Sequence, residues 1–336
     1  MDWYPAQFFN TAAPPSSPFA LLVLNQPINQ NAYKILKKHA SFTICADGGA
    51  NRLYNLMRAS GRESIELPDA IVGDLDSISP EVRKHYEDLH VPVIHDPDQY
   101  STDVTKCLCY LRSCTQSIIA PSNSKNGTAA ATTTTTAAAA AVAAAATTAT
   151  IAERHNRHID VLLLGGLGGR VDQAFSLINH LYISSTSTST STAASTVNPS
   201  TSSASSSSPP PLPPHEHNQL YLISEESISF ILRHGHNIIH TPGGSLMGIS
   251  PPPAQTTQPT PLSENIGIIP IAGPAVITTH GLEWDVQDWK THFGGQVSTS
   301  NHVRSEVVEV DVDADVPVLF TVELAGWVKG AGVCSI

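Results

Sequence analysis

Aspartates follow several of the apolar, strand-like segments of this chain. Asp47 comes after FTICA, Asp74 and Asp76 come after AIVG, and Asp98 and Asp103 come after PVIHDP. In an open parallel sheet the carboxyl ends of the strands form one edge, and ligands bind along it. Carboxylates that meet there repel one another, and a Mg²⁺ ion held together with substrate phosphates relieves that repulsion. The set therefore predicts a metal and phosphate site, although a single Asp after a strand is more often a turn residue or a helix cap.

A glycine-rich segment, LLLGGLGGRVDQ at residues 162–173, is the second feature that suits phosphate chemistry. Glycines between a buried strand and a helix let backbone N–H groups approach phosphate oxygens, and the guanidinium of Arg170 adds further donors. The segment is not a dinucleotide-binding fingerprint, because Val171 stands where the third Gly of G-x-G-x-x-G would fall. The sequence also contains no G-x-x-x-x-G-K-[ST] motif, which excludes a P-loop enzyme.

The residues around these motifs alternate between strand and helix patterns. Continuous apolar runs predict strands at 21–25, 42–47, 70–74, 91–95, 159–165 and 220–224. Helical patterns lie near 31–39, 50–59, 80–89, 102–114 and 170–183. Ser79 is expected to cap the third of these helices, with Pro80 at its first position. Buried strands that alternate with helices predict an α/β fold with a mostly parallel, Rossmann-like sheet covered by helices on both faces.

After about residue 236 the pattern changes to short strands and turns, ending in VVEVDVDADVPVLFTVEL. This alternation predicts an antiparallel, all-β sandwich. We therefore expect an α/β domain over residues 1–235 and a β-rich domain over 236–336. Three low-complexity segments, at about 120–150, 184–217 and 250–262, are rich in Ala and Thr, in Ser, Thr and Pro, or in Pro. We expect them to be disordered insertions, because such tracts bury too little apolar surface to offset chain entropy.

The composition excludes several classes of protein. The 336 residues contain 18 Lys and Arg against 29 Asp and Glu, a net charge of −11, whereas a general nucleic-acid-binding protein needs a basic surface. The five cysteines form no C-x-x-C pair, so neither a zinc site nor a disulfide framework is expected. The first residues lack the features of a signal peptide, and the Ala/Thr-rich run lacks the large apolar residues of a membrane span. We expect a cytoplasmic protein that binds neither nucleic acid nor membrane.

Six motifs, taken in order along the chain, closely resemble those of the eukaryotic thiamine pyrophosphokinase family. They are ADGGANRLY (46–54), GDLDSISPEVR (73–83), DQYSTDVTKCL (98–108), GGLGGRVDQ (165–173), TTHGLEWDV (278–286) and VSTSN (297–301). The resemblance implies an ATP-binding α/β domain and a thiamine-binding β-rich domain, in a homodimer with a shared active site. It also implies transfer of pyrophosphate from ATP to the thiamine hydroxyl, giving thiamine diphosphate and AMP. Glu283 departs from the family, where a basic residue is frequent, and this leaves the affinity for the substrate open.

The resemblance also implies roles for individual residues. Asp74, Asp76 and Asp103 would hold Mg²⁺ and act together with Lys106 in catalysis, and either Asp103 or Asp76 would accept the hydroxyl proton. The nucleotide and its phosphates would be bound by Gly48, Gly49, Gln99, Thr102, Gly165, Gly166, Gly168, Gly169, Arg170, Asp172 and Gln173, with Asp47 near the nucleotide or the metal. The thiamine pocket would be lined by Trp284, Ser298, Ser300 and Asn301.

Structural roles remain open for some of these residues. Lys106 could be a solvent-exposed helix lysine, Asp172 a helix cap, Trp284 a core aromatic residue and 298–301 a polar turn. Two alternatives also remain for the whole protein. One is a different nucleotide-dependent transferase on the same fold, and the other is a catalytically silent sensor of thiamine or nucleotide.

Overall fold

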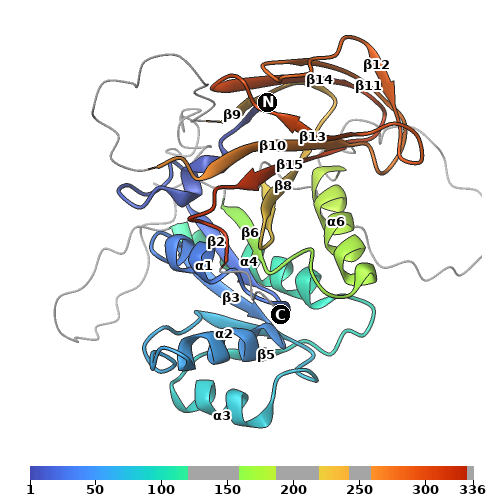
Figure 1. Ribbon diagram of the computed structural model, residues 1–336. Helices are drawn as coiled ribbons and strands as arrows, with labels where there is room; N and C mark the ends of the chain where they lie inside the picture. The colour runs from blue at the N-terminus through green and yellow to red at the C-terminus, as the bar shows by residue number, and fades with distance from the viewer. Residues whose placement is uncertain (120–158, 187–218, 242–258, 331–336) are drawn as a thin grey trace, which may run out of the picture.

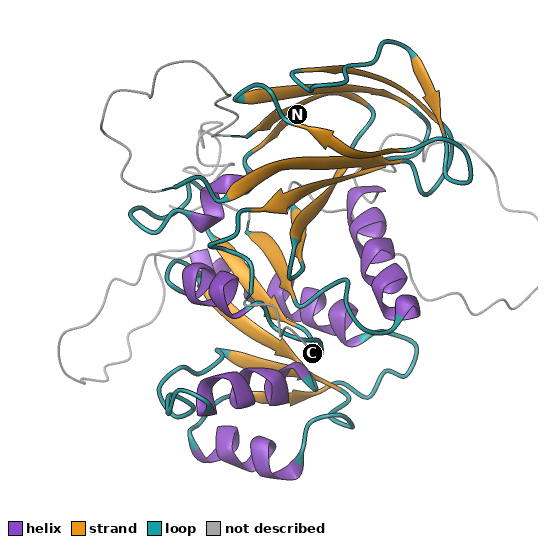
Figure 2. Ribbon diagram, viewed as in Figure 1, coloured by secondary structure: helices purple, strands orange, loops and turns teal. Residues whose placement is uncertain are grey.

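One long sheet runs through both halves of the protein in the computed structural model (Figure 1), which describes residues 1–119, 159–186, 219–241 and 259–330. This sheet has ten strands in the order β13-β10-β15-β8-β7-β6-β2-β3-β4-β5, and a second sheet has five in the order β1-β9-β14-β11-β12. The α/β part lies at the bottom of Figures 1 and 2 and the β sandwich at the top. The predicted fold class, α/β followed by a β-rich region, is confirmed.

The parallel half of the long sheet consists of the six strands that the apolar runs predicted. They are β2 (Phe19–Val23), β3 (Phe42–Ala46), β4 (Ala70–Gly73), β5 (Val93–His95), β6 (Asp160–Leu164) and β7 (Leu220–Ile223). All neighbours from β7 to β5 pair in parallel. Most of these strands are completely buried, which explains why they are continuously apolar rather than alternating.

Helices cover both faces of this parallel half. They are the 3₁₀-helix η1 (Pro5–Phe9) and the α-helices α1 (Gln30–Lys37), α2 (Gly49–Arg58), α3 (Pro80–Asp88), α4 (Asp103–Ile119) and α6 (Val171–Thr186). The predicted cap of α3 is confirmed, because the Ser79 hydroxyl accepts a hydrogen bond from the Val82 N–H and Pro80 begins the helix.

The order of the strands decides where a ligand can bind. The chain moves from β2 through β3 and β4 to β5, and α1, α2 and α3 share a core with one face of these strands. It then returns to β6 on the other side of β2, and α4 and α6 pack on the opposite face. Right-handed crossovers require this change of face when the direction reverses. The reversal lies between β2 and β6, and a crevice opens at the carboxyl ends of strands at such a point.

The second half of the long sheet is antiparallel. Its strands are β8 (Ser227–Leu232), β10 (Leu262–Ile269), β13 (Ser298–His302) and β15 (Val318–Leu324). The second sheet contains β1 (Asp2–Trp3), β9 (Gly235–His240), β11 (Ala275–His280), β12 (Trp289–Thr291) and β14 (Val307–Asp313). Side chains of both sheets share one apolar core, which includes Phe230, Phe320, Ile277 and Val310. These two packed sheets are the predicted sandwich.

Two features of the fold were not expected from the sequence. The sandwich is continuous with the parallel sheet, because β8 pairs with β7 on one side and with β15 on the other. The N-terminal strand β1 joins the second sheet by pairing in parallel with β9.

The three predicted insertions lie largely outside the described residues. The expected limits were too wide at two points, because residues 184–186 belong to α6 and Leu262 begins β10. In the described ranges no helix has both the length and the apolar character that a bilayer crossing requires.

Candidate active site

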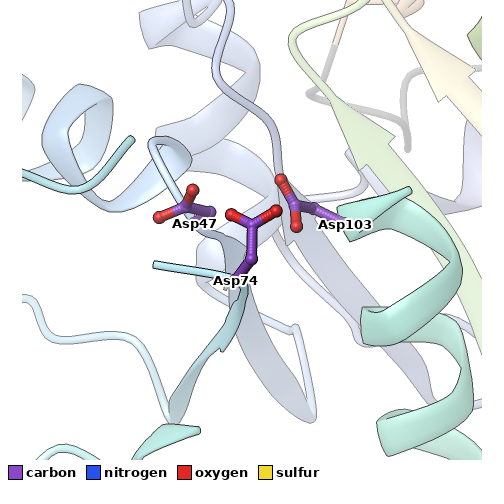
Figure 3. Close-up of side chains that lie close together, drawn as sticks. All are labelled: Asp47, Asp74 and Asp103. Atoms are coloured by element: carbon purple, nitrogen blue, oxygen red, sulfur yellow. The ribbon is translucent and has the colours of Figure 1, made fainter. Parts of the chain in front are cut away.

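Three carboxylates converge at the carboxyl edge of the parallel sheet. Asp47 follows β3, Asp74 follows β4, and Asp103 is the first residue of α4. One oxygen from each lies within 4.8 Å of the others, and Figure 3 shows the three side chains pointing toward one another. The predicted convergence of aspartates from different strands is therefore present in the structure. We call Asp47, Asp74 and Asp103 the carboxylate cluster.

The backbone around Asp47 holds this cluster in place. Asp47 has a positive φ of 39°, and its two carboxylate oxygens accept hydrogen bonds from the N–H groups of Ser77 (2.9 Å) and Ile78 (3.0 Å). Gly73 lets the carboxylates approach, since a Cβ atom there would lie 2.6 Å from the Cβ of Asp47 and 3.0 Å from Oδ1 of Asp103. Any larger residue at position 73 would therefore push the cluster apart.

Lys106 lies one turn after Asp103 on α4 and points into the cluster. Its side chain is only 1% exposed, and Nζ is 3.5 Å from Oδ2 of Asp74 and 3.6 Å from Oδ1 of Asp103. Neither Nζ nor the buried Oδ1 of Asp103 has a hydrogen-bond partner among the described residues. The alternative of a solvent-exposed helix lysine is wrong, and both orphaned atoms face a site that a further group would complete.

The electrostatics of the cluster show that its charges are not balanced. Burial raises the pKa of Asp47 to about 6, although the N–H groups of Ser77 and Ile78 act against this rise. Burial and then repulsion from Asp74 raise the pKa of Asp103. Burial also acts to raise the pKa of Asp74, but the Asp76 N–H and the Lys106 ammonium outweigh it, so this pKa is lowered. The three carboxylates together therefore favour a bound cation.

Two further aspartates that the sequence analysis placed at this edge, Asp76 and Asp98, lie outside the cluster. Asp76 is exposed, and its carboxylate accepts a hydrogen bond from the Ser77 hydroxyl (2.8 Å). Asp98 accepts hydrogen bonds from the Tyr100 N–H (2.9 Å) and the Ser101 hydroxyl (2.5 Å), as a turn residue does. The structure thus groups Asp47, rather than Asp76, with Asp74 and Asp103. Metal binding by Asp76 stays a prediction.

A pocket of about 240 Å³ opens beside the cluster, and we call it the carboxylate pocket. Its walls are residues 24–26 after β2, Ala46, Asp74, residues 101–104 at the start of α4, and Gln173, Ser176, Leu177 and His180 on α6. It lies at the point where the strand order reverses. Of the residues predicted to bind the nucleotide, Thr102 and Gln173 line this pocket.

The pocket contains polar residues that the sequence analysis missed. Asn25 and Gln26 follow β2 and line the pocket. Their position just after an apolar strand is the same signal that identified the aspartates, but only carboxylates were considered. His180 is buried on α6, and its Nε2 lies 2.9 Å from the Thr102 hydroxyl. Burial lowers the pKa of His180 and favours the neutral ring. His180 is seven residues after Gln173, a spacing that puts both on one face of a helix.

The glycines of the predicted nucleotide site have packing roles. Gly48 and Gly49 are buried, and a Cβ atom on Gly49 would lie 2.3 Å from the carbonyl oxygen of Val23. Gly165 and Gly169 have positive φ values of 92° and 77°, which the turn into α6 requires. Gly169 is close to the carboxylate pocket, because a Cβ atom on it would lie 2.9 Å from Oε1 of Gln26, which lines that pocket.

The remaining predicted nucleotide residues do not line the pocket. Gly166 is buried against Leu222, whereas Gly168 and Gln99 are exposed. Arg170 and Asp172 are exposed and pair with each other, with Nε of Arg170 3.1 Å from Oδ1 of Asp172. Their contact with a nucleotide stays a prediction. Asp172 lies in the first turn of α6, where a carboxylate also stabilises the helix.

A second pocket, of about 260 Å³, lies in the β sandwich around Trp284. Its walls include Trp289 and Val286 as well as Trp284, together with Ser298 and Asn301 from β13. We call it the Trp284 pocket. Trp284 is 56% exposed, so the alternative of a core aromatic residue is wrong.

An irregularity in β13 gives the Trp284 pocket its polar side. Asn301 pairs with Ile266 and Ser298 with Ile268, so two residues of β13 lie opposite the single residue Gly267. Ser300, with φ at 59°, is one of the two. Such a bulge brings residues three apart onto the same face, where a regular strand would put them on opposite faces. Ser298–Asn301 are therefore strand residues, not a polar turn.

Asn301 and Ser300 differ in their relation to this pocket. Asn301 is buried, accepts a hydrogen bond from the Trp284 N–H (3.2 Å) and donates one to the Trp284 carbonyl (2.9 Å). It therefore holds the Trp284 backbone while lining the pocket. Ser300 is exposed and does not line it, so a contact between Ser300 and a ligand stays a prediction.

Models of two protein families match this chain. One, described as "Thiamin pyrophosphokinase, catalytic domain", matches residues 33–192, and the other, "Thiamin pyrophosphokinase, vitamin B1 binding domain", matches residues 255–317. The first range contains the carboxylate cluster, Lys106 and α6. The second contains the Trp284 pocket.

Curated relatives match over most of their length. Thiamine pyrophosphokinase 3 of Oryza sativa subsp. japonica is 28% identical over 317 residues, which are 91% of this chain and 87% of the relative. Thiamine pyrophosphokinase of Saccharomyces cerevisiae is 29% identical over 289 residues, 84% of this chain and 78% of the relative.

Two solved structures share the fold. Thiamin pyrophosphokinase from Candida albicans has a TM-score of 0.65 at 24% identity, and covers 96% of this chain and 93% of its own. Yeast thiamin pyrophosphokinase has a TM-score of 0.66 at 23% identity, and covers 96% and 91%. At these identities the likeness concerns the arrangement of the elements.

Proposed function

Because the chain belongs to the thiamine pyrophosphokinase family, we propose that it is an enzyme that transfers the pyrophosphoryl group of ATP to the hydroxyl of thiamine. The products are thiamine diphosphate and AMP. The observation that carries this proposal is the carboxylate cluster with the buried Lys106, beside a pocket at the switch point of a parallel sheet. These are the groups that phosphoryl transfer requires, because the protein's main tasks there are positioning and charge stabilisation.

The cluster fits a magnesium ion. The donor set consists of carboxylate oxygens, which Mg²⁺ prefers, and the buried Oδ1 of Asp103 has no hydrogen-bond partner among the described residues. Asp74 and Asp103 would hold the ion, with Asp47 beside them and Asp76 as a further predicted ligand. A bound Mg²⁺ supplies positive charge that offsets the charge of the phosphate oxygens.

The residues of the cluster and pocket then have distinct tasks. The thiamine hydroxyl oxygen forms a bond to the β-phosphorus of ATP, and the bond from this phosphorus to the bridging oxygen of AMP breaks. The hydroxyl proton passes to a carboxylate at this edge of the sheet, either Asp103 or Asp76. The ammonium of Lys106, beside Asp74 and Asp103, would stabilise the negative charge of the phosphates. Thr102 and Gln173 orient the nucleotide from the pocket walls.

We place thiamine in the Trp284 pocket. The thiazolium ring of thiamine carries a fixed positive charge, and the face of a tryptophan attracts such a cation by ~0.5–2 kcal/mol. Trp284 presents an exposed ring at the pocket wall, with Ser298 and Asn301 as polar neighbours.

We further propose a homodimer with a shared active site. The carboxylate pocket and the Trp284 pocket have no described residue in common, although one reaction needs the groups of both. In a two-fold dimer the cluster of one subunit can meet the Trp284 pocket of the other, and the reciprocal site forms by symmetry. A cytoplasmic location stays a prediction from the sequence.

Product analysis tests the reaction. Purified protein is incubated with ATP, Mg²⁺ and thiamine, and the nucleotides and thiamine esters are separated. We expect AMP and thiamine diphosphate in equal amounts, and none from an Asp74→Asn control. Release of ADP instead of AMP would refute pyrophosphoryl transfer. A panel of other acceptor alcohols distinguishes a thiamine-specific enzyme from a transferase of other specificity.

Mixing of subunits tests the shared site. Asp74→Asn and Trp284→Ala proteins, each nearly inactive at low thiamine, are mixed and allowed to exchange subunits. Activity should partly return, because one of the two sites in a mixed dimer has both groups intact. No recovery after confirmed exchange, or a monomer at working concentration, contradicts the shared site.

A further inference from the structure

His302 lies beside Trp284 but outside the Trp284 pocket. The two ring centroids are 5.2 Å apart with the rings tilted by 43°, and His302 is not part of the pocket wall. The ring of His302 therefore contacts the indole without occupying the space of a ligand.

Glu283 fixes the orientation of His302. Nδ1 of His302 is 2.8 Å from Oε2 of Glu283, a hydrogen-bond distance that sets the rotation of the imidazole ring. Arg304 pairs with the same oxygen of Glu283, and its other nitrogen lies 2.5 Å from Oε2 of Glu264 on β10. Glu283, in the loop between β11 and β12, is thus held by His302 at the end of the edge strand β13 and by Arg304.

Trp284 needs such support because of where it is. More than half of its surface is exposed, and the loop between β11 and β12 provides no helix or strand to restrict its side chain. Asn301 holds its backbone by two hydrogen bonds but does not restrict the ring. Among the described residues, the imidazole of His302 makes a ring contact with the Trp284 indole and restricts its orientation.

We propose that His302 and Glu283 are positioning residues that hold the Trp284 indole in the orientation that receives the cationic ring of thiamine. This inference rests on the proposed function. It also accounts for Glu283, which departs from the family pattern: its carboxylate holds His302 and Arg304 rather than a substrate.

The test compares substrate KM values of variants. His302→Ala should raise the thiamine KM by about 3- to 10-fold, part of the roughly 30-fold that loss of a whole cation–π contact can cause. The ATP KM should stay within twofold. His302→Phe restores an aromatic contact without the ion pair and should return the thiamine KM to within about twofold of wild type. Glu283→Ala keeps the imidazole but frees its rotation, and should raise the thiamine KM by a smaller factor.

The chain offers a matched control. His240 also lies against an exposed aromatic ring, at 4.1 Å from Tyr4, and pairs with a carboxylate, Oδ1 of Asp2 at 3.4 Å. It is on β9 and does not line the Trp284 pocket. His240→Ala should leave both KM values unchanged, so any general effect of losing an exposed histidine pair is subtracted.

Three results would overturn the inference while leaving the proposed function intact. They are a thiamine KM within twofold of wild type in both His302→Ala and Glu283→Ala, an equal rise in the ATP KM, and a His302→Phe variant no better than His302→Ala. Wild-type protein that releases no AMP from ATP and thiamine would instead refute the proposed function, and the inference with it.

Discussion

Replacement of Lys106 by methionine tests the electrostatics of the carboxylate cluster directly. The ammonium lies 3.5 Å from Asp74 and 3.6 Å from Asp103. At an effective dielectric constant of about 20, each of these attractions is ~4–5 kcal/mol. The cost of burying the ammonium, several kcal/mol, offsets much of this sum. Methionine has a similar length and no charge, so the variant leaves two carboxylates facing each other without a cation.

Removing one partner of a buried ion pair typically costs ~3–5 kcal/mol. Both carboxylates here are partly exposed, and Asp103 can take up a proton to relieve the repulsion. We therefore expect the free energy of unfolding of Lys106→Met to fall by ~2–4 kcal/mol in EDTA at pH 7.5. Mg²⁺ should restore more stability to the variant than to the wild type, because the ion supplies the missing charge to the folded state only.

The assay is urea unfolding followed by circular dichroism, with and without Mg²⁺. Lys84→Met is the matched control, because Lys84 is an exposed helix lysine whose loss should change stability by less than about 0.5 kcal/mol. A Lys106→Met variant as stable as this control in EDTA refutes the reasoning. So does a loss of stability that Mg²⁺ leaves unchanged.

Three further predictions concern the metal site, the thiamine pocket and the sheet. Asp74→Asn and Asp103→Asn should each lower AMP release by at least ~100-fold, and Asp103→Asn should not lower the melting temperature, since its repulsion from Asp74 is relieved; near-wild-type rates in both would contradict the metal assignment. Trp284→Ala should raise the thiamine KM far more than the ATP KM in steady-state assays, and equal rises would speak against the thiamine pocket. Burial raises the pKa of Asp160 on β6 to about 6. The folded state therefore disfavours the ionised carboxylate, and the free energy of unfolding falls as pH rises from about 4 to about 6. Asp160→Asn should keep the hydrogen bond from the Gln219 N–H and raise the free energy of unfolding by up to ~3 kcal/mol at pH 7 but not at pH 4; urea unfolding at both pH values checks this, and an equal change at both would exclude the linkage.

The sequence by itself determined the local elements and the edge at which the chemistry lies. Six apolar runs predicted six strands to within about two residues, and most of these strands are buried, because continuous apolar character is what a strand covered on both faces requires. The position of Asp47, Asp74 and Asp103 directly after or near strand ends predicted that they converge, since parallel strands all end at one edge. These conclusions depend only on residues that are neighbours along the chain.

The tertiary structure alone decided which of those residues act together. Asp76 is two residues after Asp74, but the backbone turns between them at Leu75, with φ at 63°, and the Asp76 side chain faces solvent. Lys106 is buried because α4 packs on β3 and β4, a contact that the pattern of α4 does not specify.

The same holds for the sandwich and its pocket. β8 pairs with β15 although some ninety residues separate them, and this pairing makes the two halves one sheet. The bulge at Ser300 depends on the register between β13 and β10, and it brings Ser298 and Asn301 to the same pocket. Strand pairing and side-chain burial follow from contacts between segments far apart in the chain, whereas strand and helix propensity follow from neighbouring residues. Local patterns therefore predicted the elements and the edge of the site, and only the packing of distant segments decided its members.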